Sequence, residues 1–239
     1  MQIETEWLLE EAIVGIQQKW GVRALQKAPY AKPDVPPIST GYRSLDRVLG
    51  GGVPEGAITE FTGFATSGIY TVALRALACS QETEKSGGYI DTVGAFDPDY
   101  VAHCEVDLSK LLLVRPRNIT EAIEIALDLI RNRIGMLVWD STTPFITKHQ
   151  DRQLLARAFK QFRMLAATTG TVLLFLNPLN SPDVREPITS DIALRVHFRR
   201  TSWLYERGTL SGYQVQATVL KSRFVPVGAR TELAISLPI

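Results

Sequence analysis

A pair of glycines in the first half of the chain constrains the fold more than any other feature of the sequence. Gly63 and Gly68 have the spacing of the phosphate-binding loop G-x-x-x-x-G-K-[ST], whose backbone N–H groups curl around a phosphate. Residues 57–62 have the pattern of a short apolar strand, and residues 71–80 have that of a helix. Strand, glycine loop and helix in this order favour an α/β domain, although an ordinary strand–turn–helix connection fits the local pattern equally well.

The two positions that carry the chemistry of this motif are changed. Ile69 stands where the motif has the lysine that brings positive charge to the outer phosphates, and Tyr70 stands where a hydroxyl holds Mg²⁺. Thr71 lies one residue further, where a helix turns its side chain about 100° away. We therefore expect no cofactor, with ATP and Mg²⁺ as the disfavoured alternative. The loop remnant comprises Gly63, Ser67, Gly68, Ile69, Tyr70 and Thr71.

Composition narrows the class of protein. The 239 residues are 45% hydrophobic and 21% charged, as in globular domains, and the net charge of +1 provides no broad basic field for nucleic acid. Two cysteines are too few for a disulfide framework, and the three histidines are scattered, so we expect no metal site. The N-terminus has acidic residues within its apolar pattern, and no long apolar run follows. We expect a cytoplasmic protein with no membrane contact.

Predicted strands and helices alternate through most of the chain. Asn118 is placed to cap a helix over residues 119–132, with Glu121 positioned for a capping box, and a second helix is expected over residues 151–168. The fold class predicted is α/β, a mostly parallel central sheet flanked by helices, extended by antiparallel C-terminal strands. The expected parallel strands cover residues 89–92, 111–114, 136–139 and 171–176, and the antiparallel ones cover residues 192–199, 203–205, 213–221 and 231–236.

The N-terminal segment is predicted to be a small helical appendage. Residues 1–27 are expected to form a helix and a strand, residues 28–37 a proline-rich linker, and residues 38–239 the core domain. The helix packs on its own domain or on a neighbouring molecule, and the pattern leaves both open. Its apolar stripe, a candidate docking surface, comprises Leu9, Ile13, Ile16 and Trp20.

Several motifs occur in a consistent order along nearly the whole chain. They are residues 13–25 (IVGIQQKWGVRAL), 38–63 (ISTGYRSLDRVLGGGVPEGAITEFTG), 89–101 (YIDTVGAFDPDYV), 136–142 (MLVWDST), 175–178 (FLNP) and 219–235 (VLKSRFVPVGARTELAI). Together they resemble the RecA family of recombinases. The resemblance implies a RecA-like P-loop core that begins after the N-terminal helix.

The resemblance also implies roles for particular residues. Asp140 matches the carboxylate that helps to hold Mg²⁺, but capping of neighbouring backbone amides is the favoured alternative. Tyr100 matches a position that stacks on adenine, with a half-buried helix-face aromatic as the alternative. Lys221 and Arg223 match a basic pair that reaches a neighbouring subunit's nucleotide, with a solvated strand face as the alternative.

Departures from the family pattern point away from catalysis. Val93 falls at the position of the catalytic glutamate, and Pro178 falls at that of the sensor glutamine. Valine cannot polarise a water molecule for attack on a phosphate, and proline has no side-chain donor. With Ile69 and Tyr70, four functional positions are altered, so hydrolysis of ATP is no longer the expected task.

The DNA-binding loops of the family are reduced. Arg185 is the only basic residue between Asn177 and Ile192. A denser basic cluster follows, and it predicts weak binding of single-stranded DNA through stacking and phosphate contacts. An edge strand protected by charge is the favoured alternative. The cluster comprises Arg195, His197, Arg199, Arg200, Trp203, Tyr205 and Arg207.

Three functions fit the sequence. The leading one is a catalytically silent RecA-like protein that acts in DNA repair, recombination or the SOS damage response by contacting a RecA-type recombinase or another repair protein. In this it loosely resembles the RecA-like accessory proteins of bacterial mutagenic translesion synthesis. The alternatives are a weak, DNA-dependent ATPase and a self-assembling structural module, the latter a homo-oligomer.

Overall fold

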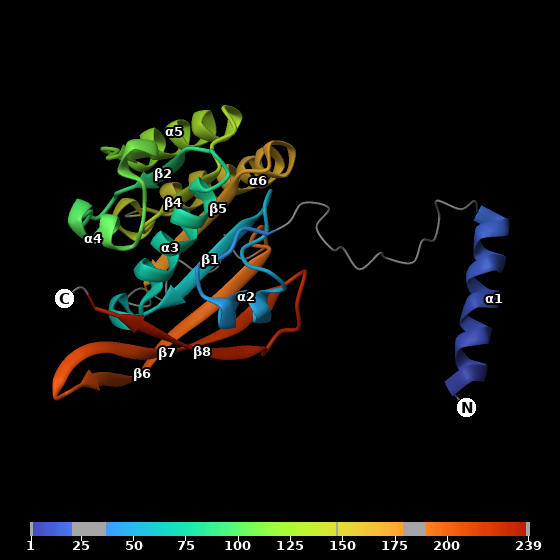
Figure 1. Ribbon diagram of the computed structural model, residues 1–239. Coiled ribbons are helices and arrows are strands. Elements are labelled where there is room, and N and C mark those ends of the chain that lie inside the picture. The colour runs from blue at the N-terminus through green and yellow to red at the C-terminus, as the bar shows by residue number, and fades with distance from the viewer. Residues whose placement is uncertain (1, 21–36, 147, 179–189, 238–239) are drawn as a thin grey trace. The chain divides into compact units, whose positions relative to one another are not determined.

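The computed structural model describes residues 2–20, 37–146, 148–178 and 190–237, with side chains from Glu11 onward except those of Thr143 and Pro178 (Figure 1). The chain divides into two compact units, Met1–Lys32 and Pro33–Ile239. The first unit contains helix α1 (Gln2–Trp20), where the sequence predicted a helix. The strand predicted after it and nearly all of the proline-rich linker lie outside the described residues.

The second unit is built on a sheet of eight strands in the order β3-β2-β4-β5-β1-β6-β7-β8. The first six strands in this order run parallel, and β6, β7 and β8 pair antiparallel, which confirms the predicted fold class. The strands are β1 (Ile58–Gly63), β2 (Gly87–Ile90), β3 (Leu111–Val114), β4 (Met136–Trp139), β5 (Val172–Pro178), β6 (Leu194–Glu206), β7 (Thr209–Ser222) and β8 (Arg230–Ser236).

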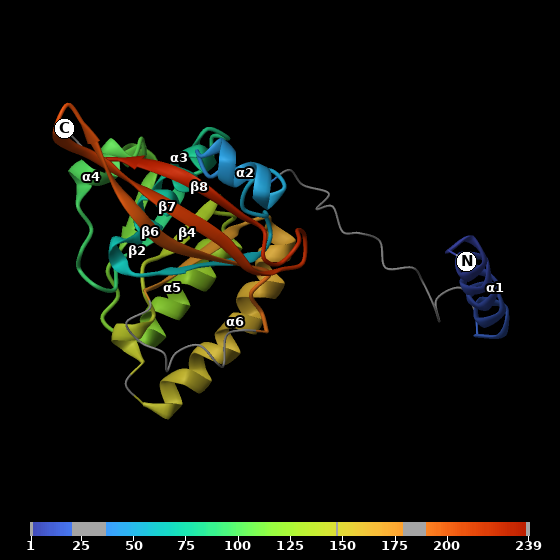
Figure 2. The ribbon, with the colours of Figure 1, turned by 90° about the horizontal axis from the view of Figure 1, so that it is seen from below.

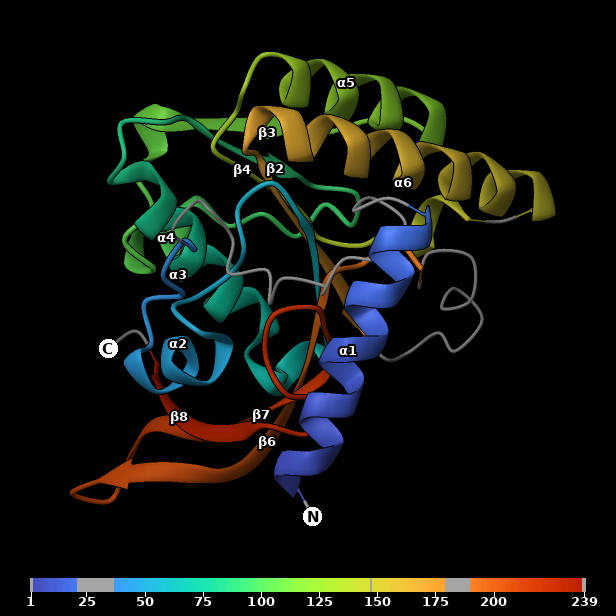
Figure 3. The same cartoon turned by 90° about the vertical axis from the view of Figure 1, so that its right-hand side faces the viewer.

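Helices cover both faces of this sheet (Figure 2). On one face, α2 (Arg43–Leu49), α3 (Ile69–Gln81) and α4 (Pro98–His103) share a core with the inward side chains of the strands. On the other face, α5 (Ile119–Arg131) and α6 (His149–Thr169) lie side by side over a second core (Figure 3). In this core the Trp139 and Phe175 rings stack, with 5.4 Å between their centroids. Apolar side chains on both faces explain why the central strands are continuously hydrophobic.

The start of α5 shows how the sequence sets a helix boundary. The Asn118 side chain accepts the Glu121 N–H at 3.0 Å, as the capping pattern predicts. The prediction of a capping box, in which the Glu121 side chain would accept the Asn118 N–H, is wrong. The Glu121 carboxylate accepts the Arg117 N–H at 2.9 Å and also pairs with the Arg117 guanidinium at 3.0 Å. The acidic side chain therefore reaches one residue further back than a capping box would.

Strand β6 differs most from the prediction. The sequence predicted separate strands at 192–199 and 203–205, but one strand continues from Leu194 to Glu206 and pairs with β7 throughout. Register shifts occur at three places along it, and they interrupt the two-residue alternation on which the prediction depended. The hairpin closes through Arg207 and Gly208, both with positive φ.

Among the described residues, none of the helices combines the length and the apolar character that a membrane span requires.

Candidate functional site

The glycine loop joins β1 to α3 at the carboxyl end of β1. Ala65–Ser67 form a 3₁₀ turn, and Gly68 follows with a φ of 86°, in the left-handed region that favours glycine. The Ser67 N–H donates to the Phe64 carbonyl at 2.8 Å. This amide is therefore engaged within the turn, where a phosphate-binding loop needs free N–H groups.

Neighbouring groups pack tightly around Gly63, the first glycine of the loop. A Cβ built on Gly63 would overlap the Ser67 hydroxyl, and it would lie 2.5 Å from the Phe198 carbonyl and 3.3 Å from Ile69 Cγ2. Ile69 is fully buried in the core beneath α3, and the buried Ser67 hydroxyl has no hydrogen-bond partner among the described residues. The residue at the lysine position is thus a core residue, and its side chain offers no charge to a phosphate.

The second glycine is covered by the C-terminal strands. A Cβ on Gly68 would collide with Ile235 Cδ1 and would lie 3.4 Å from the Tyr213 hydroxyl. Tyr213 comes from β7 and Ile235 from β8, and both are buried. Strands remote in sequence therefore pack directly against the loop.

The charge of Asp140 acts on the hydroxyl of Tyr70, the residue at the Mg²⁺-binding position of the motif. Burial raises the pKa of Tyr70 to about 12, and the Asp140 carboxylate adds to the rise, so this phenol is neutral at physiological pH. A neutral, half-buried phenol is not the small hydroxyl that Mg²⁺ coordination uses. Among the described residues, no group of three His, Cys, Asp or Glu side chains is placed to hold a metal ion.

Asp140 follows β4 and is buried against the loop after β2. Its carboxylate accepts the Thr92 hydroxyl at 2.5 Å, the Thr92 N–H at 3.0 Å and the Val93 N–H at 3.4 Å. Burial raises the pKa of Asp140 to about 6, these hydrogen bonds oppose the rise, and the charge of Asp91 adds to it. The geometry is that of a carboxylate that ties backbone amides, the alternative favoured by the sequence.

Asp91 is a site residue that the sequence analysis did not identify. Its carboxylate pairs with Arg115 Nε at 3.0 Å and accepts the N–H groups of Gly94 at 2.7 Å and Ala95 at 3.1 Å. Burial would raise the pKa of Asp91, but these partners hold it below its usual value. Its place at the end of a predicted strand was the available signal. The Val93 side chain beside it is half exposed.

Tyr100 is tied to α3 through its hydroxyl. The Tyr100 hydroxyl lies 2.7 Å from Thr71 Oγ1, and its ring lies beside His103 on the same helix. Burial raises the pKa of Tyr100, and the hydrogen bond with Thr71 opposes the rise. The residue is therefore a half-buried aromatic on a helix face, and Thr71 contributes to packing between α3 and α4.

The predicted basic cluster does not form one surface. Arg195 is largely buried, its Nε donates to the Glu60 carboxylate, and Asn177 Nδ2 donates to the same carboxylate at 3.0 Å. The edge-strand interpretation is also wrong for this part of β6, which pairs with β1 up to Phe198 and with β7 on its other side.

The outer part of the cluster lies on the β6–β7 hairpin. Arg199 is exposed and donates to Gln216 Oε1 at 3.1 Å. The Arg200 guanidinium lies 4.0 Å from the centre of the Trp203 ring, which is 44% exposed. Tyr205 and Arg207 are exposed near and at the turn. Arg185 lies outside the described residues, and Pro178 ends β5 with its backbone paired to Gly63.

Lys221 and Arg223 lie at the opposite end of β1 from the glycine loop. Leu194 pairs with both Thr59 and Ser222, so the end of β7 meets the start of β1, whereas the loop follows Gly63. Burial lowers the pKa of Lys221, and the charges of Arg195 and Arg223 add to the effect. The exposed Arg223 donates through Nη2 to the Ser190 carbonyl at 3.4 Å. The pair is thus placed away from this chain's own loop.

The predicted docking stripe falls on α1. Trp20 is 68% exposed and Ile16 is 38% exposed, whereas Ile13 is half-buried. The Lys19 ammonium lies 5.3 Å from the Trp20 ring. Leu9 is within the helix, but its side chain lies outside the described residues.

Comparison with known proteins identifies the family. The family described as the RecA N-terminal domain matches residues 7–237. Protein RecA of Ruminococcus albus is 31% identical over 253 residues, and the match covers 93% of this chain but 63% of that protein. Protein RecA of Aquifex aeolicus is 30% identical over 254 residues, covering 93% of this chain and 72% of the relative. Protein RecA of Synechocystis sp. is 29% identical over 241 residues, covering 90% and 68%. The chain therefore belongs to the RecA family.

Proposed function

We propose that this chain is a catalytically silent member of the RecA family that serves DNA repair or recombination, in the damage response, through contacts with other proteins. The observation that carries the proposal is the fully buried isoleucine at the lysine position, in a loop whose two glycines are closely packed by Ser67, Phe198 and Ile235. Tyr70, Val93 and Pro178 remove three further groups on which phosphoryl transfer depends in the family.

The first test is binding of Mg-ATP, followed by isothermal titration calorimetry. Loss of a charge-assisted lysine contact alone weakens binding by about ten- to a hundredfold, and the closed loop weakens it further. We expect no saturable heat at micromolar ATP and no release of phosphate, under conditions in which a RecA-type protein of the same host shows both. Micromolar binding with measurable turnover would contradict the proposal and favour the alternative of a DNA-dependent ATPase.

The proposed partner is a RecA-type subunit. The reason is that the glycine loop and the basic pair Lys221 and Arg223 lie near opposite ends of β1. In the head-to-tail assembly that we propose, a neighbour's nucleotide loop would face the end of β1 near which Lys221 and Arg223 lie. Two cations there complement the phosphates of a neighbour's ATP, although this chain holds no ATP itself. Helix α1 adds an exposed apolar surface at Ile16 and Trp20, which a partner can cover.

Co-sedimentation with the host's RecA-type filament tests this docking, with and without an ATP analogue. We expect the wild-type chain in the pellet, and we expect less of it after truncation before Ala28 or after Lys221→Ala with Arg223→Ala. The matched control is Arg157→Ala with Lys160→Ala, which removes two exposed cations from α6. Absence of the intact protein from the pellet, or equal behaviour of both double variants, would contradict filament docking. Light scattering after size exclusion addresses the alternative of a self-assembling module, which predicts concentration-dependent oligomers without any partner.

A further inference from the structure

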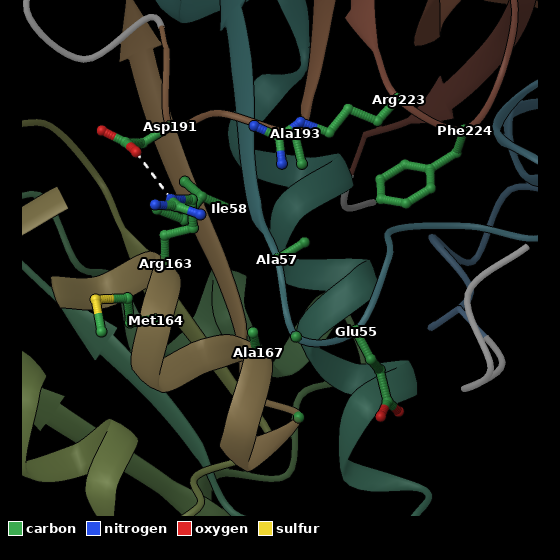
Figure 4. A pocket seen from close by; sticks show the side chains of 12 residues that line it. Glu55, Ala57, Ile58, Arg163, Met164, Ala167, Asp191, Ala193, Arg223 and Phe224 are labelled. Atoms are coloured by element: carbon green, nitrogen blue, oxygen red, sulfur yellow. Dashed lines mark hydrogen bonds and ion pairs between the residues drawn. The ribbon is translucent and has the colours of Figure 1, made fainter. Parts of the chain in front are cut away.

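A pocket of about 580 Å³ lies at the start of β1, on the opposite end of that strand from the glycine loop (Figure 4). It lies between the C-terminal half of α6, the approach to β6 and the segment that follows β7. Small residues form part of its walls and leave space between the larger side chains. They are Gly56, Ala57, Ala167, Gly170 and Ala193, joined by Ile58.

The charged residues around the pocket differ in exposure. The Asp191 side chain is 9% exposed and pairs with Arg163 Nε at 2.9 Å, and the Glu55 side chain is 11% exposed. By contrast, the Arg163 side chain is 47% exposed, and Arg223 is exposed and extends toward Ala193 (Figure 4). The carboxylates are therefore part of the walls, and the mouth presents two guanidinium groups.

Two apolar side chains flank this cationic mouth. Met164 is 65% exposed on α6, and Phe224 is half-buried on the far side of the pocket. Exposed methionine is typical of surfaces that adapt to an apolar side chain, because its thioether is flexible and polarizable. The pocket thus combines apolar surface with two exposed guanidinium groups, of which that of Arg163 is paired with Asp191 and that of Arg223 is not paired with a lining carboxylate.

This arrangement favours a carboxylate over a phosphate. Helix α6 ends at Thr169, next to Gly170 in the pocket wall, so the negative end of its dipole faces the site. Asp191 and Glu55 add negative charge to the walls, and the lining residues form no glycine loop of free amides of the kind that phosphate sites use. A dianionic phosphate inside the cavity is disfavoured by these groups more strongly than a carboxylate that carries a single charge, whereas the phosphates of a neighbour's ATP would meet Arg223 together with Lys221, which does not line the pocket.

We propose that this pocket is a docking site for a peptide segment of a partner protein, in which a leucine- or phenylalanine-sized side chain enters the cavity. An acidic residue next to that side chain lies on Arg223 and Arg163 at the mouth. Charge complementarity selects this occupant, since guanidinium groups bind carboxylates in a planar, bidentate manner. Arg223 is also one of the two cations proposed to meet a neighbour's ATP, so such a peptide and a docked neighbour would compete for it.

Two methionines provide a direct test by NMR of protein labelled with ¹³C at the methionine methyl groups. Met164 lines the pocket, and the fully buried Met136 is an internal control. The probes are acetyl-Leu-Phe-Asp-Asp-amide and its uncharged counterpart acetyl-Leu-Phe-Asn-Asn-amide. We expect the acidic peptide to shift the Met164 resonance but not that of Met136, with about tenfold weaker binding of the Asn peptide.

Variants on the pocket and next to it sharpen the test. Ala167→Leu places a branched side chain in the cavity from an exposed helical position and is expected to abolish binding, whereas Gln161→Leu on the same helix leaves it unchanged. Arg223→Gln should weaken binding of the acidic peptide severalfold, and Lys160→Gln is its charge-matched control. If Ala167→Leu does not fold, the comparison of Arg223→Gln with Lys160→Gln still tests the proposal.

Three outcomes would overturn the proposal. The first is a Met164 resonance that the acidic peptide leaves unmoved at millimolar concentration. The second is equal binding of the two peptides, or of the wild type and the Arg223→Gln variant. The third is a larger Met164 shift with AMP or ADP than with the acidic peptide, which would assign the pocket to a nucleotide. Filament co-sedimentation enters none of these results, so failure of the proposed docking on a RecA-type subunit remains a separate outcome.

Discussion

Ile69 begins α3 with none of its surface exposed, so its side chain packs the core in the position where the family's motif has a charged residue. The change therefore cannot be reversed by one substitution. A lysine at this position would bury an ammonium group among Val72, Phe198 and the residues around them. The apolar side chain at this position is thus part of the packing beneath α3.

A stability measurement follows from this burial. We expect Ile69→Lys to lower the free energy of unfolding by about 3–5 kcal/mol without restoring ATP binding, because the charge has no partner in the core. The control Ile69→Val should cost about 0.5–1.5 kcal/mol. Urea unfolding followed by circular dichroism gives both values. A lysine variant as stable as the valine variant would mean that the site is open to water.

Asp140 gives the folded chain a dependence on pH with a definite sign. Its pKa is about 6 in the folded chain against the ordinary value of 3.8, so between these values the folded state binds more protons than the unfolded state. Stability from this group is therefore present at low pH and is lost as pH rises from about 4 to about 6. We expect wild type to lose up to about 3 kcal/mol relative to Asp140→Asn between pH 4 and pH 7. Urea titrations at both pH values check this, with the exposed Asp99→Asn as control, and an unchanged difference would refute the burial of a titrating carboxylate.

Residue roles that depend on a single strand end could be predicted from sequence, whereas those that depend on packing between strands could not. Asp140 follows an apolar strand directly, and its placement was inferred from that position. The pairing of Arg195 with Glu60 was not predicted, because it requires β6 to lie beside β1. These two residues are 135 positions apart in the sequence. A row of basic residues in sequence therefore resembled a surface that the fold does not form.

At the scale of elements, the β6–β7 hairpin is the part of the basic cluster that nucleic acid can reach. Arg199 and Arg207 are exposed on it, and Trp203 offers a ring that Arg200 already stacks upon. Pairing with β1 stops at Phe198, so the outer half of β6 is paired with β7 alone. The aromatic and basic side chains there suit stacking and phosphate contacts, but two exposed arginines support weak binding only.

Fluorescence anisotropy with a labelled single strand tests this element across a series of salt concentrations. Arg199→Ala with Arg207→Ala should weaken binding at low salt and reduce the slope of log affinity against log salt by about 1.4. Arg117→Ala with Arg131→Ala removes two exposed arginines near the ends of α5 and serves as the control of equal net charge. If the two double variants behave alike, the hairpin makes no specific contribution. Tight binding that persists at high salt would reveal a recognition surface elsewhere.

Elements with one strong local signal were predicted with accurate bounds. The runs at Leu111–Val114 and Met136–Trp139 are apolar and short, each is followed directly by a charged residue, and the strands begin and end at those residues. Helix α2 was not predicted, because it has seven residues and no capping side chain at Tyr42. Asp46 stabilises it instead by accepting from Ser39 at 2.6 Å and from the Thr40 hydroxyl at 2.7 Å, across a turn whose geometry the sequence does not display.

At the scale of the whole molecule, the sequence predicted the α/β class because apolar strands alternate with amphipathic helices and then give way to alternating strands. It did not predict the strand order, which depends on crossover connections between strands far apart in the chain. That order joins β5, β1 and β6 at the centre, and it places β7 and β8 against the glycine loop. The closure of the loop is therefore a property of the assembled sheet.

The opposition between the two ends of β1 gives the molecule a direction. In the assembly that we propose, the end with Lys221 and Arg223 provides cations to a phosphate-bearing neighbour, and the end with the glycine loop provides no phosphate in return. If such a subunit joined a row of RecA-type proteins, it could bind at one terminus of the row. The next subunit would then meet no ATP phosphates to bind. The effect of this chain would then scale with the number of termini and not with the total amount of filament. A small amount of the protein would set the average length of many long filaments, and breaking the same filaments into short pieces would exhaust it.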